Sequence, residues 1–256
     1  MIKTAEQIEC MRTAGKLTAQ VLESLDGLIQ PGITTLDIDA HCAQFIRERL
    51  QARPASLGQY GYPYCVNTSV NHEVCHGMPS EKKLKKGDIV NVDVTVEKNG
   101  YMGDSSKMFA VGDIAPHAEK LIRITQECLY DAIRTVRPGA SLGDIGHAIQ
   151  TRAERNRYSV VREYCGHGIG TQMHEAPQVR HYGKAKSGLC LEAGMTFTIE
   201  PMINQGKRFI REIRKNDWGV AVTKDRRLSA QWEHTILVTE VGYEVLTIRE
   251  EERGLI

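Results

Sequence analysis

Two aspartates near the middle of the chain, Asp93 and Asp104, are spaced so that they could share one cation. Asp93 lies in residues 89–97, where Val and Ile alternate with polar residues in the period of a β-strand. Asn99-Gly100 is a favoured two-residue hairpin turn, so the return strand should place Asp104 diagonally beside Asp93. Two like charges at that separation repel, and a bound cation would remove the repulsion. Taken alone, Asp93 also fits a solvent-facing carboxylate.

Three later residues, His167, Glu200 and Glu233, complete a candidate metal-binding set. Glu200 ends an apolar, strand-like run, Glu233 precedes a β-prone run, and His167 stands between two glycines. A lone histidine in a glycine turn is often structural. Four carboxylates with one imidazole suit a pair of divalent ions better than a structural zinc, because each carboxylate offers two oxygens and can bridge. Mn²⁺, Fe²⁺, Co²⁺ and Zn²⁺ all tolerate such ligands.

The elements that must position these residues follow from hydrophobic periodicity. Apolar residues three or four apart from Ile8 to Leu28 predict a helix that Pro31-Gly32 ends. Thr34 with Asp37, and Ser141 with Asp144, have the spacing of helix-capping pairs. The predicted elements are a helix at about 8–28, a helix from 34 toward 50, a loop with one strand at 53–80, a hairpin at 89–111, a helix at 116–136 and a helix from 141.

The chain repeats itself with an offset of 107 residues. Residues 31–38 parallel residues 138–145, and the same offset relates Leu84, Gly87 and Asp93 to Leu191, Gly194 and Glu200. The predicted fold class is α+β, a duplicated unit of two helices followed by an antiparallel strand pair. The halves span about 1–111 and 112–250, and with no linker between them they should form a single domain, 1–256. Pseudo-twofold symmetry would then bring Asp93 and Glu200 together.

Composition and charge exclude several classes of protein. The 33 basic and 32 acidic residues nearly cancel, which argues against a dedicated nucleic-acid or membrane-surface protein. No apolar run approaches the roughly 20 residues of a membrane helix, and residues 1–10 have no apolar signal region, so we expect a cytoplasmic protein. The seven cysteines are odd in number and lack C-x-x-C spacing, which favours free thiols.

Several longer motifs make the chain resemble the type I methionine aminopeptidases of peptidase family M24. The resemblance extends from about residue 3 to residue 248. The motifs that carry it are Val74-Cys75-His76-Gly77-Met78-Pro79, residues 89–95 with Asp93, residues 103–109 with Asp104, Gly166-His167-Gly168-Ile169-Gly170 followed by His174 and residues 179–182, residues 198–201 with Glu200, and residues 224–235 with Glu233. This resemblance implies the pita-bread fold, whose pseudo-twofold symmetry agrees with the repeat.

The resemblance also implies an activity, removal of the initiator methionine from nascent proteins when the second residue is small. Asp93 would bind one of two metal ions, Asp104 and Glu233 would bridge the pair, and His167 and Glu200 would complete the second. A water shared by the ions would attack the scissile carbonyl, and Glu200 would shuttle its proton. His76 and His174 would contact the substrate and stabilise the tetrahedral intermediate, although without the resemblance ordinary polar packing would be the simpler interpretation of both.

By the same resemblance, Tyr62, Met173 and Trp218 would line the pocket for the methionine side chain. The chain departs from the family at three positions near that pocket. Members of the family usually have Cys where this chain has Asn67, commonly have Phe at the position of Met173, and frequently have an aromatic residue at the position of Gln59. Met is apolar and adaptable, so methionine selectivity should survive. The departures bear on the pocket shape and the inhibitor preference.

The partners implied are N-terminal Met peptides and nascent chains, with neither nucleic acid nor membrane, and the family expectation is a monomer. A transient ribosome contact through the lysines at 82, 83, 85 and 86 stays open beside a solvated loop. Two alternative functions also stay open: an Xaa-Pro peptidase of the same fold, and a non-catalytic pita-bread binding protein.

Overall fold

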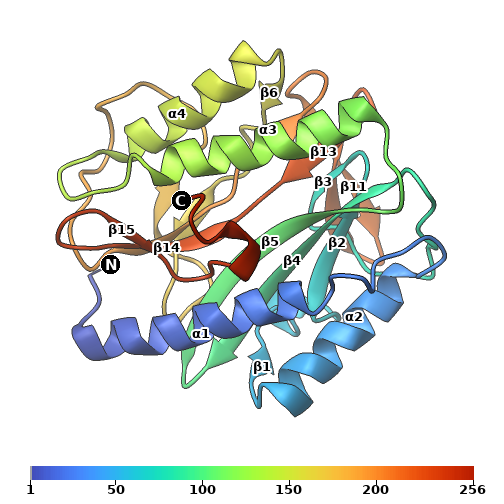
Figure 1. Cartoon of the computed structure of the whole chain (residues 1–256), viewed down its shortest axis with the longest axis horizontal. Helices are drawn as coiled ribbons and strands as arrows, with labels where there is room; N and C mark the ends of the chain where they lie inside the picture. Colours follow the sequence, from blue (N-terminus) through green and yellow to red (C-terminus); the bar gives the residue numbers. More distant parts are fainter. Residues whose placement is uncertain (1) are drawn as a thin grey trace.

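The helices form two pairs, one above and one below the strands in the view of Figure 1. The computed structural model describes residues 2–256. The first pair is α1 (Ala5–Glu23) and α2 (Thr35–Gln44), and the second is α3 (Pro116–Ile133) and α4 (Leu142–Arg155). The predicted capping pairs are confirmed: the carboxylates of Asp37 and Asp144 accept the backbone N–H of Thr34 and Ser141 at 2.9 and 2.8 Å.

Antiparallel strands pack against both helix pairs, α1 and α2 on strands of the first half, and α3 and α4 mainly on strands of the second half. In the first half, β4 (Ile89–Lys98) pairs along one edge with β5 (Tyr101–Ala110) and along the other with β1 (Arg53–Pro54) and β2 (Val66–Val70). In the second half the strand order is β15 (Tyr243–Val245), β14 (His234–Val238), β9 (Thr196–Ile199), β7 (Gly166–Gly168) and β8 (Glu175–Val179). Smaller sheets join β11 (Ile210–Lys215), β12 (Trp218–Thr223) and β3 (Glu73–Cys75), and β13 (Ser229–Gln231), β10 (Met202–Asn204) and β6 (Ser159–Val160). Short helical turns are η1 (Phe45–Arg49), η2 (Gln59–Gly61) and η3 (Glu250–Glu252).

The two halves meet where β5 runs beside the start of β14, a junction we call the seam. Ser106 on β5 forms a bridge with Glu233, and the Glu233 N–H donates to the Ser106 carbonyl at 3.2 Å. Two residues away, the Asp104 N–H donates to Thr235 Oγ1 at 3.0 Å. The seam therefore brings a carboxylate from each half to one point.

The sequence repeat is also a structural repeat. Thr34 bridges Lys83 and Ser141 bridges Cys190, so corresponding bridges differ by the predicted 107 residues. The N–H of Gly32 donates to Leu84 and that of Gly139 to Leu191, at 2.8 and 2.9 Å, with the same offset. Each half is thus two helices followed by an antiparallel pair, β4–β5 or β9–β14, as predicted.

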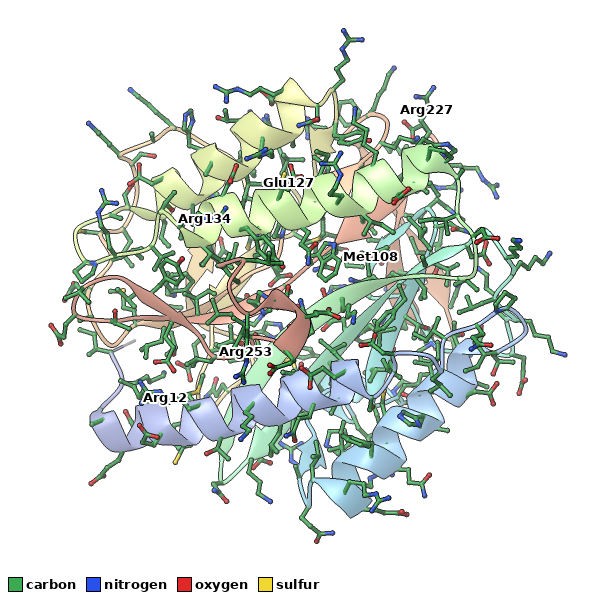
Figure 2. The ribbon with its side chains drawn as sticks, viewed as in Figure 1. Arg12, Met108, Glu127, Arg134, Arg227 and Arg253 are labelled. Atoms are coloured by element: carbon green, nitrogen blue, oxygen red, sulfur yellow. The ribbon has the colours of Figure 1, made fainter. Side chains whose placement is uncertain are left out.

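Each helix pair covers its own apolar core. Val90, Val92, Val94 and Val96 of β4 pack with residues of α1 and α2, because every second residue of a strand faces the same way. On the other side, Met108 of β5 packs with α3 residues, and Figure 2 shows its side chain between the strand and that helix. No helix among residues 2–256 is long and apolar enough to cross a membrane. All seven cysteines are free.

The structure differs from the sequence-based prediction mainly between residues 53 and 80. We predicted a loop with one strand there, but the segment contains β1, β2 and β3. These strands are short, and each pairs with a strand distant in the chain, β4 or β12, so the local pattern is weak. The helix predicted at 116–136 ends at Ile133, and the helix predicted at 8–28 spans Ala5–Glu23.

Candidate metal centre

Asp93 and Asp104 lie where the hairpin register predicted. Asp93 is opposite Ser106 and Asp104 is opposite Thr95, so the two carboxylates are diagonal neighbours on one face of the β4–β5 pair. The turn residues Asn99-Gly100 have the positive φ values, 54° and 81°, that such a turn needs. Thr95 Oγ1 donates to Asp104 Oδ1 at 2.9 Å and holds that carboxylate in one orientation.

Glu200 and Glu233 both stand at a break in a strand. Glu200 directly follows β9, and Glu233 fills the gap between β13 and β14. Ile199 pairs with His234, so the two glutamates leave adjacent strands at the same level. Thr198 Oγ1 donates to one Glu200 oxygen at 2.9 Å, and Gln231 Nε2 lies 3.3 Å from the other.

His167 reaches the carboxylates because its neighbours on β7 are glycines. A Cβ on Gly168 would lie 2.1 Å from the Ala176 carbonyl, so only glycine allows β8 to approach so closely. The His167 Nδ1 lies 3.0 Å from the Gly168 carbonyl, an acceptor, and must therefore carry the proton. The lone pair on Nε2 then faces the carboxylates, as in a metal-binding histidine.

The distances around His167 Nε2 are those of ligands about a common centre rather than of hydrogen bonds. Nε2 lies 3.8 Å from Asp104 Oδ2 and 3.6 Å from Glu200 Oε1. Donor atoms of Asp104, His167 and Glu233 all lie within 4.8 Å of one another. An ion between them could contact all three.

Burial shapes the charge of the site. It raises the pKa of Asp104 to about 7. It also raises the pKa of Asp93, Glu200 and Glu233, and in each case the negative charge of Asp104 is the second cause. Burial lowers the pKa of His167 to about 4, so the imidazole is neutral at neutral pH. Crowded carboxylates beside a neutral imidazole fit divalent cations, which would compensate the repulsion.

One cavity of about 390 Å³ contains every residue that the sequence nominated for the site. The five candidate ligands lie on its walls together with His76, His174, Tyr62, Met173 and Trp218. Gln59 and Asn67, the departures from the family pattern, line the same cavity. The predicted positions of all twelve residues therefore converge, although they come from segments up to 174 residues apart in the chain.

The two further histidines approach the cavity from opposite halves. His174 is exposed, and its ring lies 4.3 Å from that of His167. His76 has a left-handed φ of 57°, and its carbonyl accepts the Trp218 Nε1–H at 3.0 Å. Burial lowers the pKa of His76 to about 4 and lowers the pKa of His174. Both rings are therefore neutral at neutral pH and can donate one hydrogen bond each.

The sequence reasoning did not name Tyr60, Tyr164 and Gln231 as site residues, although each lines the cavity and contacts a residue that it did name. Tyr60 is 76 % exposed and stacks on His174 with ring centroids 6.0 Å apart. Tyr164 packs edge-on against His76 at 5.1 Å, and Gln231 contacts Glu200. The closely spaced glycines at 58 and 61 hinted at a constrained loop around Tyr60, but no local pattern marked the other two.

The fold and the site together define a class of metallopeptidase. The model of the metallopeptidase family M24 matches residues 9–240, and the chain belongs to that family.

The chain is similar to several methionine aminopeptidases over nearly its whole length. The methionine aminopeptidase of Escherichia coli (strain K12) is 54 % identical over 252 residues, which cover 98 % of this chain and 95 % of the relative. The crystal structure of methionine aminopeptidase from Rickettsia prowazekii superposes with a TM-score of 0.95 at 46 % identity, covering 97 % of this chain and 99 % of that one. The crystal structure of methionine aminopeptidase from Thermotoga maritima superposes with a TM-score of 0.93 at 41 % identity, covering 98 % of this chain and 99 % of that one. The predicted pita-bread fold and family resemblance are confirmed.

Proposed function

We propose that this chain hydrolyses the N-terminal methionine from peptides and nascent proteins whose second residue is small. The observation that carries the proposal is the convergence of four carboxylates and one imidazole in a cavity walled by Tyr62, Met173 and Trp218. The similarity to the Escherichia coli methionine aminopeptidase over nearly the whole chain supports the same activity.

Two divalent ions, Mn²⁺, Fe²⁺, Co²⁺ or Zn²⁺, would be held by Asp93, Asp104, His167, Glu200 and Glu233. When bound, they would acidify an attacking water and polarise the scissile carbonyl. Asp104, His167 and Glu233 would hold an ion together, because each contributes a ligand atom to one tight group. His167 contributes a neutral nitrogen, whose orientation the Gly168 carbonyl holds.

Glu200 is the candidate for moving a proton. Burial raises its pKa, so this carboxylate holds a proton more readily than an exposed one. Thr198 and Gln231 orient its two oxygens. Glu200 would accept the proton of the attacking water and deliver it to the leaving amine.

His76 and His174 would stabilise the tetrahedral intermediate. Both are neutral at neutral pH, and a neutral imidazole can donate an N–H to a developing oxyanion without bringing a competing charge. The Trp218 Nε1–H holds the His76 carbonyl and so fixes the approach of His76. Preorganised donors of this kind contribute about 10²–10³ in turnover.

The methionine side chain would occupy the aromatic end of the cavity. Tyr62 and Trp218 lie with ring centroids 4.5 Å apart, and Tyr62 directs its hydroxyl away, to the Val66 carbonyl at 2.9 Å. Met173 is 7 % exposed and completes an apolar wall. A thioether gains both hydrophobic burial and sulfur–aromatic contact in such surroundings.

The two alternative functions have less support. The prolidase of Pyrococcus furiosus superposes with a TM-score of 0.75 at 22 % identity, and the alignment covers 66 % of that chain. This similarity shows a shared fold and nothing more. A non-catalytic binding protein would have no need to place all five candidate ligands in one cavity.

The test is methionine release from Met-Ala-Ser and Met-Lys-Ser, with Ala-Pro-Ser as control, after chelation and after adding back Mn²⁺ or Co²⁺. We expect metal-dependent cleavage of Met-Ala-Ser alone. Cleavage of Ala-Pro-Ser instead would favour an Xaa-Pro peptidase, and no cleavage with any metal would favour the binding protein.

We further propose that residues 1–256 form one catalytic domain that acts as a cytoplasmic monomer. The hydrogen bonds across the seam support a single domain, because the halves share the candidate ligands. A transient ribosome contact is proposed for the exposed lysines at 82, 83, 85 and 86. We expect reversal of all four charges to weaken co-sedimentation with ribosomes, and unchanged co-sedimentation would contradict this contact.

A further inference from the structure

A fully buried arginine lies behind the metal centre. Arg249 is 0 % exposed and is one of the largest fully buried side chains in the described part of the chain. Its segment, at the dark red end of the chain, lies between α1 and α3 (Figure 1), tied to α1 by the Glu250 N–H donating to Glu23 at 2.7 Å. Removing a guanidinium from water is costly unless every partner is well placed, so this position calls for an explanation.

The first partner of Arg249 is a buried carboxylate. Arg249 Nη2 donates to Glu252 Oε1 at 2.7 Å, and the same oxygen accepts the Tyr130 hydroxyl at 2.6 Å. The other Glu252 oxygen lies 3.1 Å from His234 Nε2. His234 is the residue that follows Glu233, so this cluster already adjoins the metal centre.

The second partner of Arg249, Ser105, connects it by hydrogen bonds to the metal centre. Arg249 Nη1 donates to Ser105 Oγ at 3.0 Å, and Ser105 Oγ donates to the Glu233 carbonyl at 2.6 Å. The Glu233 N–H is held from the other side by the Ser106 carbonyl. Both backbone groups of Glu233 are therefore fixed across the seam, and Arg249 fixes the hydroxyl that holds one of them.

Asp104, the candidate ligand on the other strand of the seam, has no such dependence. Thr235 Oγ1 accepts the Asp104 N–H at 3.0 Å and donates to the Asp104 carbonyl at 2.8 Å. That pair of bonds is complete within the seam. Arg249 therefore helps to hold the backbone of Glu233 rather than that of Asp104.

We propose that Arg249 is a positioning residue for the metal centre, which fixes the backbone of Glu233 through Ser105 and so sets the affinity of the site for divalent ions. The inference rests on the proposed function. Glu233 stands in a gap between strands, where no regular ladder fixes its backbone, and needs this support from outside the sheet. Partners that orient metal ligands typically contribute 10- to 100-fold in metal affinity.

A second buried charge supplies a matched control. Lys107 also lies on β5, with a side chain 7 % exposed, and pairs with Asp26 and Glu251 at 2.7 and 2.8 Å. Glu251 belongs to the same C-terminal segment, so Lys107 anchors that segment as Arg249 does. No hydrogen bond among the described residues links the Lys107 side chain to Ser105 or Glu233.

The experiment is calorimetric titration of Mn²⁺ into the chelator-treated full chain, for wild type, Ser105→Ala, Arg249→Met and Lys107→Met. Ser105→Ala is a small change that should fold even if Arg249→Met does not. We expect Ser105→Ala and Arg249→Met each to raise the Kd for Mn²⁺ by about 10- to 100-fold. A variant with both substitutions should have a Kd no higher than the single variants, because each substitution already removes the hydrogen bond between Arg249 and Ser105. Lys107→Met should lower the Tm yet leave the Kd within about twofold of wild type.

Two results would overturn the inference while leaving the proposed function intact: an unchanged Kd in Ser105→Ala, or an equal rise in Lys107→Met. Absence of Mn²⁺ binding by the wild-type chain would overturn the proposed metal centre and this inference with it.

Discussion

Replacing Asp104 by Asn should make the metal-free protein more stable at and above neutral pH, although it removes a candidate metal ligand. Burial raises the pKa of Asp104 from 3.8 to about 7. Between those two pH values the folded protein keeps a proton that the unfolded chain has released, so the free energy of unfolding falls as the pH rises. A difference of about 3 pKa units corresponds to about 4 kcal/mol.

Asparagine has the same shape and can still accept the Thr95 hydroxyl, but it carries no charge to bury. It also removes the negative charge that raises the pKa of Asp93, Glu200 and Glu233. We therefore expect wild type and Asp104→Asn to have similar stability near pH 4. The variant should be more stable by up to about 4 kcal/mol at pH 8, in the absence of divalent ions.

The assay is urea denaturation in EDTA at pH 4, 6 and 8, followed by circular dichroism. Asp113→Asn is the control, because Asp113 is fully exposed and its pKa is lowered by Lys86, not raised by burial. Mn²⁺ at 100 times its Kd should stabilise the wild type by about 2.7 kcal/mol and the variant far less. Equal stability of wild type and Asp104→Asn in EDTA at pH 8 would refute the argument that buried repulsion is released by metal binding.

Three other substitutions test separate parts of the site. His174→Ala should lower kcat by about 10²–10³ with Mn²⁺ content unchanged, measured by peptide cleavage and atomic absorption, and normal turnover would remove His174 from the mechanism. Trp218→Ala should raise KM for Met-Ala-Ser more than it lowers kcat, because it removes apolar wall as well as the bond to the His76 carbonyl; a purely kcat effect would contradict the pocket. Gly77→Ala should destabilise the protein by at least about 1–3 kcal/mol in denaturant melts, since its Cβ would lie 2.2 Å from the Thr68 carbonyl, and an unchanged melt would show that β2 can yield there.

The sequence alone determined the parts of the site that depend on local geometry. The Asn99-Gly100 turn and the period-2 strands on either side of it predicted that Asp93 and Asp104 are diagonal neighbours, because the register of a hairpin follows from the length of its turn. The 107-residue repeat predicted the relation between Asp93 and Glu200, because duplicated units fold alike. The identities of the other ligands came from long motifs, whose residue types limit the chemistry.

Only the tertiary structure decided how these pieces meet. The approach of His167 to Asp104, the burial that raises the carboxylate pKa values and the stacking of Tyr60 on His174 join segments far apart in the chain. The same holds for Arg249, which reads as an ordinary surface arginine among the charged residues of the C-terminus yet lies wholly buried against Ser105. Burial and long-range hydrogen bonds depend on which elements pack together, and no local pattern of residues encodes that.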